Sequence, residues 1–370
     1  MPDVVRIPIT NIYAGGPYTG RIFVGAKNKP MNVFLDTGSS TLVLSRHAYC
    51  PDTGKGDVLT RFAQTVDYAD KSSWTGAVIH TSVSIGEVRR VAIPNANVAI
   101  AYYESNGVFA GYDGILGLAY TALDNAALMR KITWPRRYTQ REVERNLHKR
   151  IKPYLNQLAK TGITFDKISF YTRRSTIHYG AGVANDPLNH GWMIVGGGEE
   201  AKDLYSGRFQ TAKVMSQKWY NTNLKAVIVG NADPIRVPRG RRSGNSIVDS
   251  GTQDLEFSRD LWNAIRHRLD AGKRALLKPD GIIAMSELDL AAWPRLTVIL
   301  EGEAGDVILK IEPGDYWQIN NPRVGSASLA ISPSDDGSIT LGLPLMNSYF
   351  TIFDGEADHG KGAIRFAARR

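Results

Sequence analysis

Two short stretches of the 370-residue sequence decide the fold, FLDTGSS at residues 34–40 and IVDSGT at residues 247–252. In each stretch an apolar run leads into an aspartate, which is followed by a hydroxyl residue, a glycine and another hydroxyl residue. The apolar run predicts a buried strand that holds the carboxyl group rigidly, and the glycine leaves room for another segment to approach it. One such motif alone is typical of a surface turn. Two copies with the same apolar approach predict a pair of oriented acids, Asp36 and Asp249.

Each motif is followed, much later in the chain, by a second and weaker repeat. YDGILGL at residues 112–118 follows the first aspartate, and SITLGLP at residues 338–344 follows the second. A duplication of this kind indicates two half-molecules of similar design. Short apolar runs that alternate with Gly, Asn, Asp and Ser turns indicate strands in both halves. The sequence therefore predicts a mainly β, bilobal protein whose two β lobes are related by a pseudo-twofold axis, with a few short helices and a cleft between the lobes.

A glycine run and a basic insertion mark the organisation of the chain. The run at residues 196–198 predicts the boundary between an N-terminal lobe, residues 1–196, and a C-terminal lobe, residues 197–370. In the first lobe Val143, Leu147 and Ile151 recur every four residues, which predicts a helix, and Pro153 can open another. The stretch Lys131 to Lys152 is rich in Lys and Arg, so we expect a basic helical insertion, most simply a solvated helix face.

The paired acids carry a specific chemistry. Two carboxyl groups that meet across such an axis share a proton, because like charges in a low-dielectric cleft do not both ionise easily. The ionised carboxylate can then take a proton from a water molecule held between them, while its protonated partner hydrogen-bonds the carbonyl of a scissile peptide bond. The reaction needs no metal, cofactor or covalent intermediate. Because the protons belong to the pair, neither aspartate is assigned permanently as acid or base.

With both motifs and both repeats, the sequence resembles the pepsin family of bilobal aspartic peptidases over nearly all of its length. The resemblance implies that Thr37 and Ser250 form a crossed hydroxyl-to-backbone clasp beneath the two acids. It also implies that Ser39 and Thr252 hydrogen-bond the outer carboxylate oxygens. The catalytic support expected from the resemblance comprises Thr37, Gly38, Ser39, Ser250, Gly251 and Thr252.

The stretch VDYADKSSWTG at residues 66–76 is similar to the hairpin flap that closes over substrate in this family. The resemblance places Tyr68 as the flap tyrosine, although an ordinary half-exposed strand aromatic is the alternative. Phe34 and Ile115 match positions that face the cleft in relatives, which implies apolar subsites beside the cut bond; lobe core is an equal alternative. Asp70 is expected either to line the same subsite or to be an exposed hairpin charge.

Several residues depart from the family pattern. Val43 stands where the family usually has a tryptophan that hydrogen-bonds the flap tyrosine, so Tyr68 is expected to be held differently. Ala69 and Lys71 replace glycines that relatives favour in the flap, which should stiffen it. Cys50 is the one cysteine of the sequence, so an intramolecular disulfide is impossible. The chain is thus similar to disulfide-free, bacterial-type homologues, and we expect it to be made without a zymogen stage.

Composition narrows the setting of the protein. No apolar run is long enough for a signal peptide or a membrane span. With a single cysteine, a cytoplasmic location is expected, with a trimmed secreted or periplasmic form as the alternative. The formal net charge of +9 and the pI near 9.4 are consistent with attraction to nucleic acid, anionic membranes or acidic proteins, and charge alone does not decide among them. Nothing in the sequence requires more than a monomer.

Three functional hypotheses follow. The leading one is an active endopeptidase that binds an extended protein or peptide substrate, prefers bulky apolar residues at the cut and is inhibited by pepstatin-type compounds. The second is a catalytically inactive binding or inhibitor protein, which is expected to have lost an aspartate or the flap. The third is a nucleic-acid or acidic-surface binder acting through the Lys131 to Lys152 stretch, where Trp134 and Tyr138 lie among the basic residues.

Overall fold

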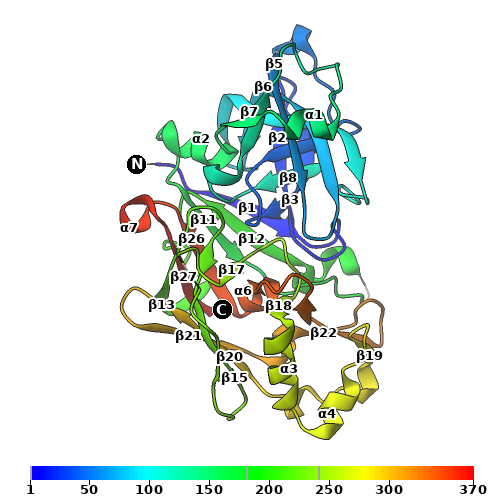
Figure 1. Ribbon diagram of the computed structural model, residues 1–370, viewed down its shortest axis with the longest axis vertical. Helices are drawn as coiled ribbons and strands as arrows, with labels where there is room; N and C mark the ends of the chain where they lie inside the picture. The colour runs from blue at the N-terminus through cyan, green and yellow to red at the C-terminus, as the bar shows by residue number, and fades with distance from the viewer. Residues whose placement is uncertain (1, 181, 241) are drawn as a thin grey trace.

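The fold is mainly β, as predicted, and has two lobes. The computed structural model describes residues 2–180, 182–240 and 242–370. The molecule is elongated, with strands of the N-terminal half in the upper lobe and strands of the C-terminal half in the lower lobe (Figure 1). No helix among the described residues is both long enough and apolar enough to cross a membrane.

The largest sheet has 15 strands and continues from the upper lobe into the middle of the molecule. Its order is β10-β9-β5-β6-β7-β4-β8-β3-β2-β1-β12-β11-β26-β27-β13. In chain order its strands are β1 (Val5–Thr10), β2 (Thr19–Val24), β3 (Lys29–Asp36), β4 (Leu42–Ser45), β5 (Val58–Asp67), β6 (Ser73–Ile85), β7 (Val91–Ser105), β8 (Gly114–Gly117), β9 (Asn125–Leu128), β10 (Leu147–Arg150), β11 (Lys167–Tyr171), β12 (His190–Val195), β13 (Tyr205–Lys213), β26 (Tyr349–Asp354) and β27 (Ala363–Arg369).

Three smaller sheets build the lower lobe, in the orders β14-β17-β25-β18-β24, β16-β15-β20-β21 and β19-β23-β22. Their strands are β14 (Asn221–Thr222), β15 (Leu224–Val229), β16 (Ile235–Arg236), β17 (Ser246–Val248), β18 (Leu255–Ser258), β19 (Ile282–Ala284), β20 (Leu296–Glu301), β21 (Asp306–Ile311), β22 (Trp317–Ile319), β23 (Ser326–Leu329), β24 (Ile331–Ser334) and β25 (Thr340–Leu341). The helices are short, namely α1 (Gln140–Glu144), α2 (Tyr154–Lys160), α3 (Arg259–His267), α4 (Ala271–Leu276), α5 (Pro313–Tyr316), α6 (Leu343–Ser348) and α7 (Ala357–Gly360).

The internal repeat is visible in how the strands pair. In the upper lobe β3 pairs parallel with β8, β8 antiparallel with β4, and β4 parallel with β7. In the lower lobe β17 pairs parallel with β25, β25 antiparallel with β18, and β18 parallel with β24. The two halves therefore use the same arrangement around each aspartate, which confirms the prediction of two lobes of similar design.

The glycines of the weaker repeats have a steric reason. A Cβ atom on Gly117 would lie 2.4 Å from the carbonyl carbon of Ser40, in the loop after Asp36. A Cβ atom on Gly342 would lie 2.3 Å from the carbonyl oxygen of Asp254, in the loop after the second aspartate. Only glycine lets each supporting strand pass this close to a catalytic-motif loop.

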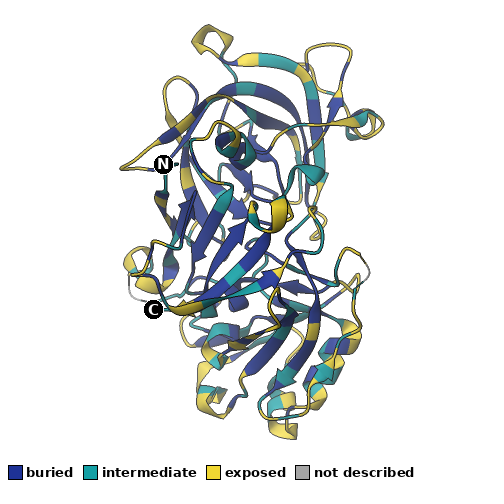
Figure 2. Cartoon of the chain, turned by 90° about the vertical axis from the view of Figure 1, so that its left-hand side faces the viewer, coloured by how far each residue is buried: buried dark blue, intermediate teal, exposed yellow. Residues whose placement is uncertain are grey.

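The core follows the strands through the middle of both lobes, while exposed residues concentrate in the outer loops and at the ends of the molecule (Figure 2). The predicted boundary at residues 196/197 comes directly after β12, which pairs with both β1 and β11. Strand β11 pairs in turn with β26 from the end of the chain. The sheet is thus continuous across the predicted boundary, and the division at 196/197 stays a prediction.

The basic insertion is less helical than predicted. Helix α1 has five residues and ends at Glu144, and residues Leu147–Arg150 form strand β10. Leu147 pairs with Ala127 of β9, so backbone pairing replaces the second turn of the expected helix. The helix expected after Pro153 is present as α2, with Leu155 and Leu158 buried.

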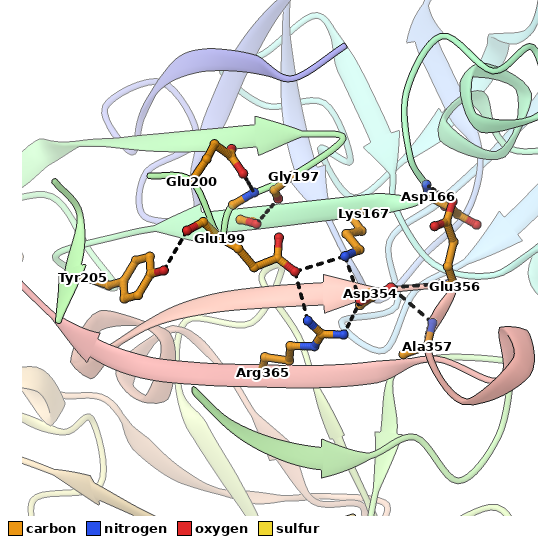
Figure 3. Close-up of polar contacts among 12 residues, drawn as sticks. Asp166, Lys167, Gly197, Glu199, Glu200, Tyr205, Asp354, Glu356, Ala357 and Arg365 are labelled. Carbon is orange, nitrogen blue, oxygen red and sulfur yellow. Dashed lines mark hydrogen bonds and ion pairs between the residues drawn. The ribbon is translucent and has the colours of Figure 1, made fainter. Parts of the chain in front are cut away.

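An ion network joins strand β11, from the middle of the chain, to strands β26 and β27 at its C-terminal end (Figure 3). Asp354, at the end of β26, contacts Lys167 Nζ of β11 at 3.2 Å and Arg365 Nη2 of β27 at 2.7 Å. Glu199 contacts the same two cations at 3.0 and 2.9 Å. The Asp354 side chain is only 2% exposed, and a carboxylate buried this far requires such partners.

Candidate active site

The two predicted acids occupy equivalent positions in the two lobes. Asp36 is the last residue of β3, and Asp249 directly follows β17. Both are buried, at 5% and 8% exposure. The weaker repeats hold their backbones in place, because the Leu118 amide donates to the Asp36 carbonyl oxygen at 2.8 Å and the Asp249 amide donates to the Leu341 carbonyl oxygen at 3.1 Å.

Thr37 and Ser250 lie beneath the acids and connect the lobes. The Thr37 amide donates to Ser250 Oγ at 3.0 Å, and the Ser250 amide donates to Thr37 Oγ1 at 2.8 Å. Ser250 Oγ donates onward to the Leu35 carbonyl oxygen at 2.9 Å. Both side chains are buried, so these crossed hydrogen bonds are shielded from water. The arrangement fixes the spacing and orientation of the two aspartate-bearing loops.

The outer carboxylate oxygens each accept from a hydroxyl group three residues later. Ser39 Oγ donates to Asp36 Oδ2, and Thr252 Oγ1 donates to Asp249 Oδ2 at 2.7 Å. Hydrogen bonds to a carboxylate hold its plane as well as its charge. Thr37, Ser39, Ser250 and Thr252 thus make these contacts in the structure, and their catalytic roles stay a prediction.

The two glycines bring the carboxyl groups together. The amides of Gly38 and Gly251 donate to Oδ1 of Asp36 and Asp249 at 2.8 and 2.9 Å. A Cβ atom on Gly251 would lie 2.5 Å from Asp36 Oδ1, and one on Gly38 would lie 2.9 Å from Asp249 Oδ2. Each carboxyl group thus lies against the glycine of the opposite lobe, and a side chain at either position would push the pair apart.

The environment favours a proton on this pair. Burial, and then the charge of Asp249, raise the pKa of Asp36 to about 7. The hydrogen bonds from Ser39 and Gly38 act in the opposite direction but do not offset burial. A carboxyl group that stays protonated up to neutral pH can donate a hydrogen bond, while its ionised partner can accept a proton.

The hairpin predicted as the flap consists of β5 and β6 with a turn at residues 68–72. The Tyr68 amide donates to the Ser72 carbonyl oxygen at 2.9 Å, and the Asp70 carboxylate accepts from the Ser72 amide at 2.8 Å. Asp70 is exposed and shapes the turn. Lys71 has φ 67°, a left-handed backbone conformation that favours glycine, so the turn carries local strain.

Tyr68 is held by a residue that sequence reasoning missed, Trp74. The Trp74 indole Nε1 donates to Tyr68 Oη at 3.1 Å, and the indole is fully buried. Burial, and then the charge of Asp36, raise the pKa of the Tyr68 hydroxyl. Val43 lies in the same apolar cluster, at the position where a tryptophan was expected. The sequence signal for this contact was a tryptophan six residues after the tyrosine. The two side chains lie side by side only because of the register in which the hairpin strands pair.

Phe34 and Ile115 belong to this apolar cluster beside the hairpin. Ile115 is buried, whereas Phe34 is half-buried with its ring centroid 5.5 Å from that of Tyr112. Tyr112, which was not singled out from the sequence, donates from Oη to the Val108 carbonyl oxygen at 2.6 Å. Burial, and then the charge of Asp36, raise its pKa, so Tyr112 lies within electrostatic reach of the dyad.

Comparison with known protein families identifies the family to which this chain belongs. The sequence matches the family model described as "Eukaryotic aspartyl protease" over residues 17–165 and 172–368. The chain belongs to the eukaryotic aspartyl protease family. It is similar to gastricsin of Callithrix jacchus, with 23% identity over 367 residues, covering 92% of this chain and 80% of the relative. It is also similar to gastricsin of Homo sapiens, with 22% identity and the same coverage of both chains. The protein is accordingly an aspartic endopeptidase, a hydrolase that acts on protein or peptide substrates.

Besides the crossed hydrogen bonds of Thr37 and Ser250, another hydrogen bond in this aspartic protease joins the lower lobe to the loop of the first motif. Trp219 Nε1 donates to the carbonyl oxygen of Gly38 at 2.9 Å. The ammonium of Lys218 lies 4.1 Å from the centroid of the Trp219 ring. Trp219 has no motif of its own in the sequence, and only the packing of the lobes brings it to the Asp36 loop.

A buried carboxyl group ties the Asp36 loop of the protease to the hairpin. Asp124 Oδ1 accepts from Thr41 Oγ1 at 2.8 Å and from Gln64 Nε2 at 2.6 Å. Thr41 follows the first motif and Gln64 is on β5, so the group bridges two parts of the site. Burial raises the pKa of Asp124 to about 7, against the lowering effect of both hydrogen bonds.

Among the residues that the structure describes, no group of three or more His, Cys, Asp or Glu side chains has the geometry to hold a metal ion. Cys50, the single cysteine of the chain, is exposed.

Proposed function

We propose that this protein hydrolyses peptide bonds with a water molecule held between Asp36 and Asp249. The observation that carries the proposal is the crossed hydrogen bonding of Thr37 and Ser250, which sets two buried carboxyl groups against one another. A pair that holds one proton has both functions needed, a base for the water and an acid for the substrate carbonyl.

In the proposed reaction the ionised carboxylate takes one proton from the water as its oxygen bonds to the scissile carbonyl carbon. The protonated carboxyl gives its proton to the carbonyl oxygen, so the intermediate is a neutral tetrahedral diol. The carbon–nitrogen bond then breaks as one diol hydroxyl gives its proton to the ionised carboxylate, and the leaving nitrogen receives the proton that the other carboxyl took from the water. The dyad ends with the one proton with which it began.

The hairpin is proposed to cover an extended substrate strand. Tyr68 is fixed by Trp74, and its pKa responds to the charge of Asp36, which supports a place beside the reacting bond. Phe34 and Tyr112 are half-buried and pack against the cluster that contains the buried Ile115, next to the hairpin, and this apolar patch supports a preference for bulky apolar residues at the cut. We further propose that the protein acts as a monomer and that pepstatin-type inhibitors occupy the same place as the substrate strand.

The test is cleavage of a quenched apolar peptide from about pH 2 to about pH 8, with and without pepstatin. Activity is expected on the acid side and is expected to fall as the pH rises and the pair loses its shared proton. Pepstatin is expected to abolish it. Activity that persists with pepstatin, or is unchanged above neutral pH, contradicts the dyad mechanism. Folded protein without activity at any pH favours a binding protein with this fold.

A further inference from the structure

We propose that a basic hollow on the upper lobe binds an acidic segment of the protein substrate away from the bond that is cut. The inference rests on the proposed endopeptidase function and adds a second point of contact for a polypeptide. The hollow is a shallow depression of about 850 Å³ that is wide open to solvent. It is lined by Arg61, Arg130, Lys131, Ile132, Trp134, Pro135 and Arg136.

The charge of the basic hollow is uncompensated. Arg61, Arg130, Lys131 and Arg136 are all exposed, and within the described parts of the chain none of them forms an ion pair with a carboxylate. The acid whose charge interacts with Arg136 is Glu142, and its carboxylate is already hydrogen-bonded by Thr139 at the start of α1. Three arginines in one place favour ligands with carboxylate groups, which arginine binds through paired N–H donors.

The hollow is held rigidly against the outer strand of the hairpin. The Met129 amide donates to the Arg61 carbonyl oxygen at 2.8 Å, and Arg61 Nε donates back to the Met129 carbonyl oxygen at 2.9 Å. Thr133 is anchored on the same strand, because its amide donates to the Thr60 carbonyl oxygen at 3.0 Å and its Oγ1 donates to the Phe62 carbonyl oxygen at 2.9 Å. The cations are therefore displayed from a segment whose backbone is fixed before any ligand arrives, which lowers the entropy lost on binding.

The same strand leads from the hollow to the flap turn. Arg61 lies on β5, which ends at Asp67 next to Tyr68. The insertion follows β5 along its length, since Gln140 Nε2 at the start of α1 donates to the Asp67 carboxylate at 3.1 Å. The hollow thus lies on the upper lobe, on the strand that leads into the turn of the proposed flap. A substrate that occupies both the hollow and the proposed catalytic site can be a single polypeptide chain.

The lining favours a peptide over a nucleic acid. Ile132 is 49% exposed and lies among the cations, where it offers a contact for apolar side chains between acidic ones. Bases of a single strand need aromatic faces to stack on, and Trp134 is the one aromatic residue of the lining and is half-buried. An acidic segment with interspersed apolar residues therefore matches the hollow in charge and in surface.

The experiment compares two quenched peptides with the same cleavage sequence. One of them also carries a hexaglutamate tail on flexible linkers of about 5, 10 or 20 residues. At about pH 6, where glutamate carboxylates are ionised and the protein is still expected to be active, and at low salt, the tail is expected to lower the KM of the wild type about 10-fold at the best linker length. Added salt is expected to remove the gain. The triple variant Arg130→Glu, Lys131→Glu and Arg136→Glu is expected to lose the gain while it cleaves the peptide without a tail as the wild type does.

A matched control separates the hollow from the overall charge. The variant Arg208→Glu, Arg268→Glu and Arg323→Glu changes the same number of exposed arginine or lysine charges in the lower lobe and is expected to keep the gain. Equal loss in both variants, or no gain from the tail in the wild type at any linker length, overturns the proposal. Failure to cleave either peptide contradicts the proposed function instead. In that event, the fluorescence anisotropy of a labelled hexaglutamate peptide still measures binding to the hollow. If an oligonucleotide of equal charge binds more tightly than this peptide, and the triple variant of the hollow loses that binding, the choice of an acidic peptide as ligand is contradicted.

Discussion

At the scale of single residues, Trp74 replaces a contact that the sequence left open. It pairs with Val66 across the hairpin, so its side chain lies diagonally next to that of Tyr68 on the same face. The indole donates to the tyrosine hydroxyl from within the hairpin itself, and Val43 on β4 leaves the adjoining position apolar. The tyrosine is therefore oriented by its own hairpin rather than by a neighbouring strand.

Replacing Trp74 with Phe is expected to lower kcat/KM for a short apolar peptide about 2- to 10-fold, the effect of losing one hydrogen bond of about 0.5–1.5 kcal/mol. An aromatic ring is kept, so the variant should fold, but the cavity left by the smaller ring should lower the melting temperature. Peptide cleavage and thermal unfolding measured on the same preparation check both points. Trp262→Phe, a half-buried tryptophan in α3, is the control and should leave kcat/KM unchanged. Equal activity of Trp74→Phe and wild type contradicts the positioning role.

The positions of the site residues could be predicted where they are contiguous in sequence with an aspartate. Thr37, Ser39, Ser250 and Thr252 lie one or three residues from an acid, within the two motifs that resemble those of the pepsin family, and the resemblance implied their contacts. Trp219 could not be found in this way, because its contact with the Asp36 loop depends on how the lobes pack. Trp74 lies in the stretch at residues 66–76 that resembles the flap, but its contact with Tyr68 could not be predicted without the pairing register of the hairpin.

At the scale of elements, Asp124 joins the hairpin to the Asp36 loop through Gln64 of β5 and Thr41. Its pKa of about 7 lies well above the usual 3.8 of an aspartate, because burial disfavours the charged form. The folded protein therefore binds this proton more tightly than the unfolded chain. As the pH rises from about 4 to about 7, the unfolded chain loses the proton first and the free energy of unfolding falls.

Asp124→Asn is expected to remove this part of the pH dependence. Relative to wild type, its melting temperature should rise between pH 4 and pH 7, which corresponds to a gain on the order of 2 kcal/mol in the free energy of unfolding at neutral pH. Unfolding by heat or denaturant at both pH values measures the difference. Asp233→Asn changes an exposed aspartate, and the pH dependence of its stability should match that of wild type. If the free energies of unfolding of Asp124→Asn and wild type change with pH in parallel, Asp124 is not the group that titrates.

Element types were predictable only where local pattern and tertiary pairing agree. The motif strands β3 and β17 are where the apolar runs placed them. Residues Leu147–Arg150 have helical spacing of apolar residues but pair with β9 as a strand, because the sheet edge offers backbone partners that a single isolated helical turn lacks.

At the scale of the whole molecule, strands from the middle and the end of the chain share one sheet, and the ion network of Lys167, Asp354, Arg365 and Glu199 stabilises it. The bilobal architecture was predictable because the aspartate motif and its weaker repeat each occur twice in the sequence. The network was not, since its members have no common motif and meet only after β11 and β26 pair.

Asp354→Asn is expected to lower the free energy of unfolding by about 2 kcal/mol, because it leaves two partly buried cations with Glu199 as their remaining partner. The Asn side-chain oxygen still accepts from the amides of Glu356 and Ala357, so the local turn is preserved. Asp203→Asn breaks the exposed pair with Arg6 and should cost less than about 1 kcal/mol. Denaturant unfolding of the two variants measures both effects, and equal destabilisation contradicts the importance of the network.

The central claim, that the protein cleaves peptides with a carboxyl pair drawn from both lobes, is tested most directly by Asp36→Asn and Asp249→Asn, each assayed on a quenched peptide at acid pH. Asparagine keeps the shape of the side chain but neither shares the proton nor accepts one from water. Each variant is expected to fold, by circular dichroism and thermal unfolding, and to lose activity by at least about 1000-fold. Activity within about tenfold of wild type in either folded variant contradicts the account.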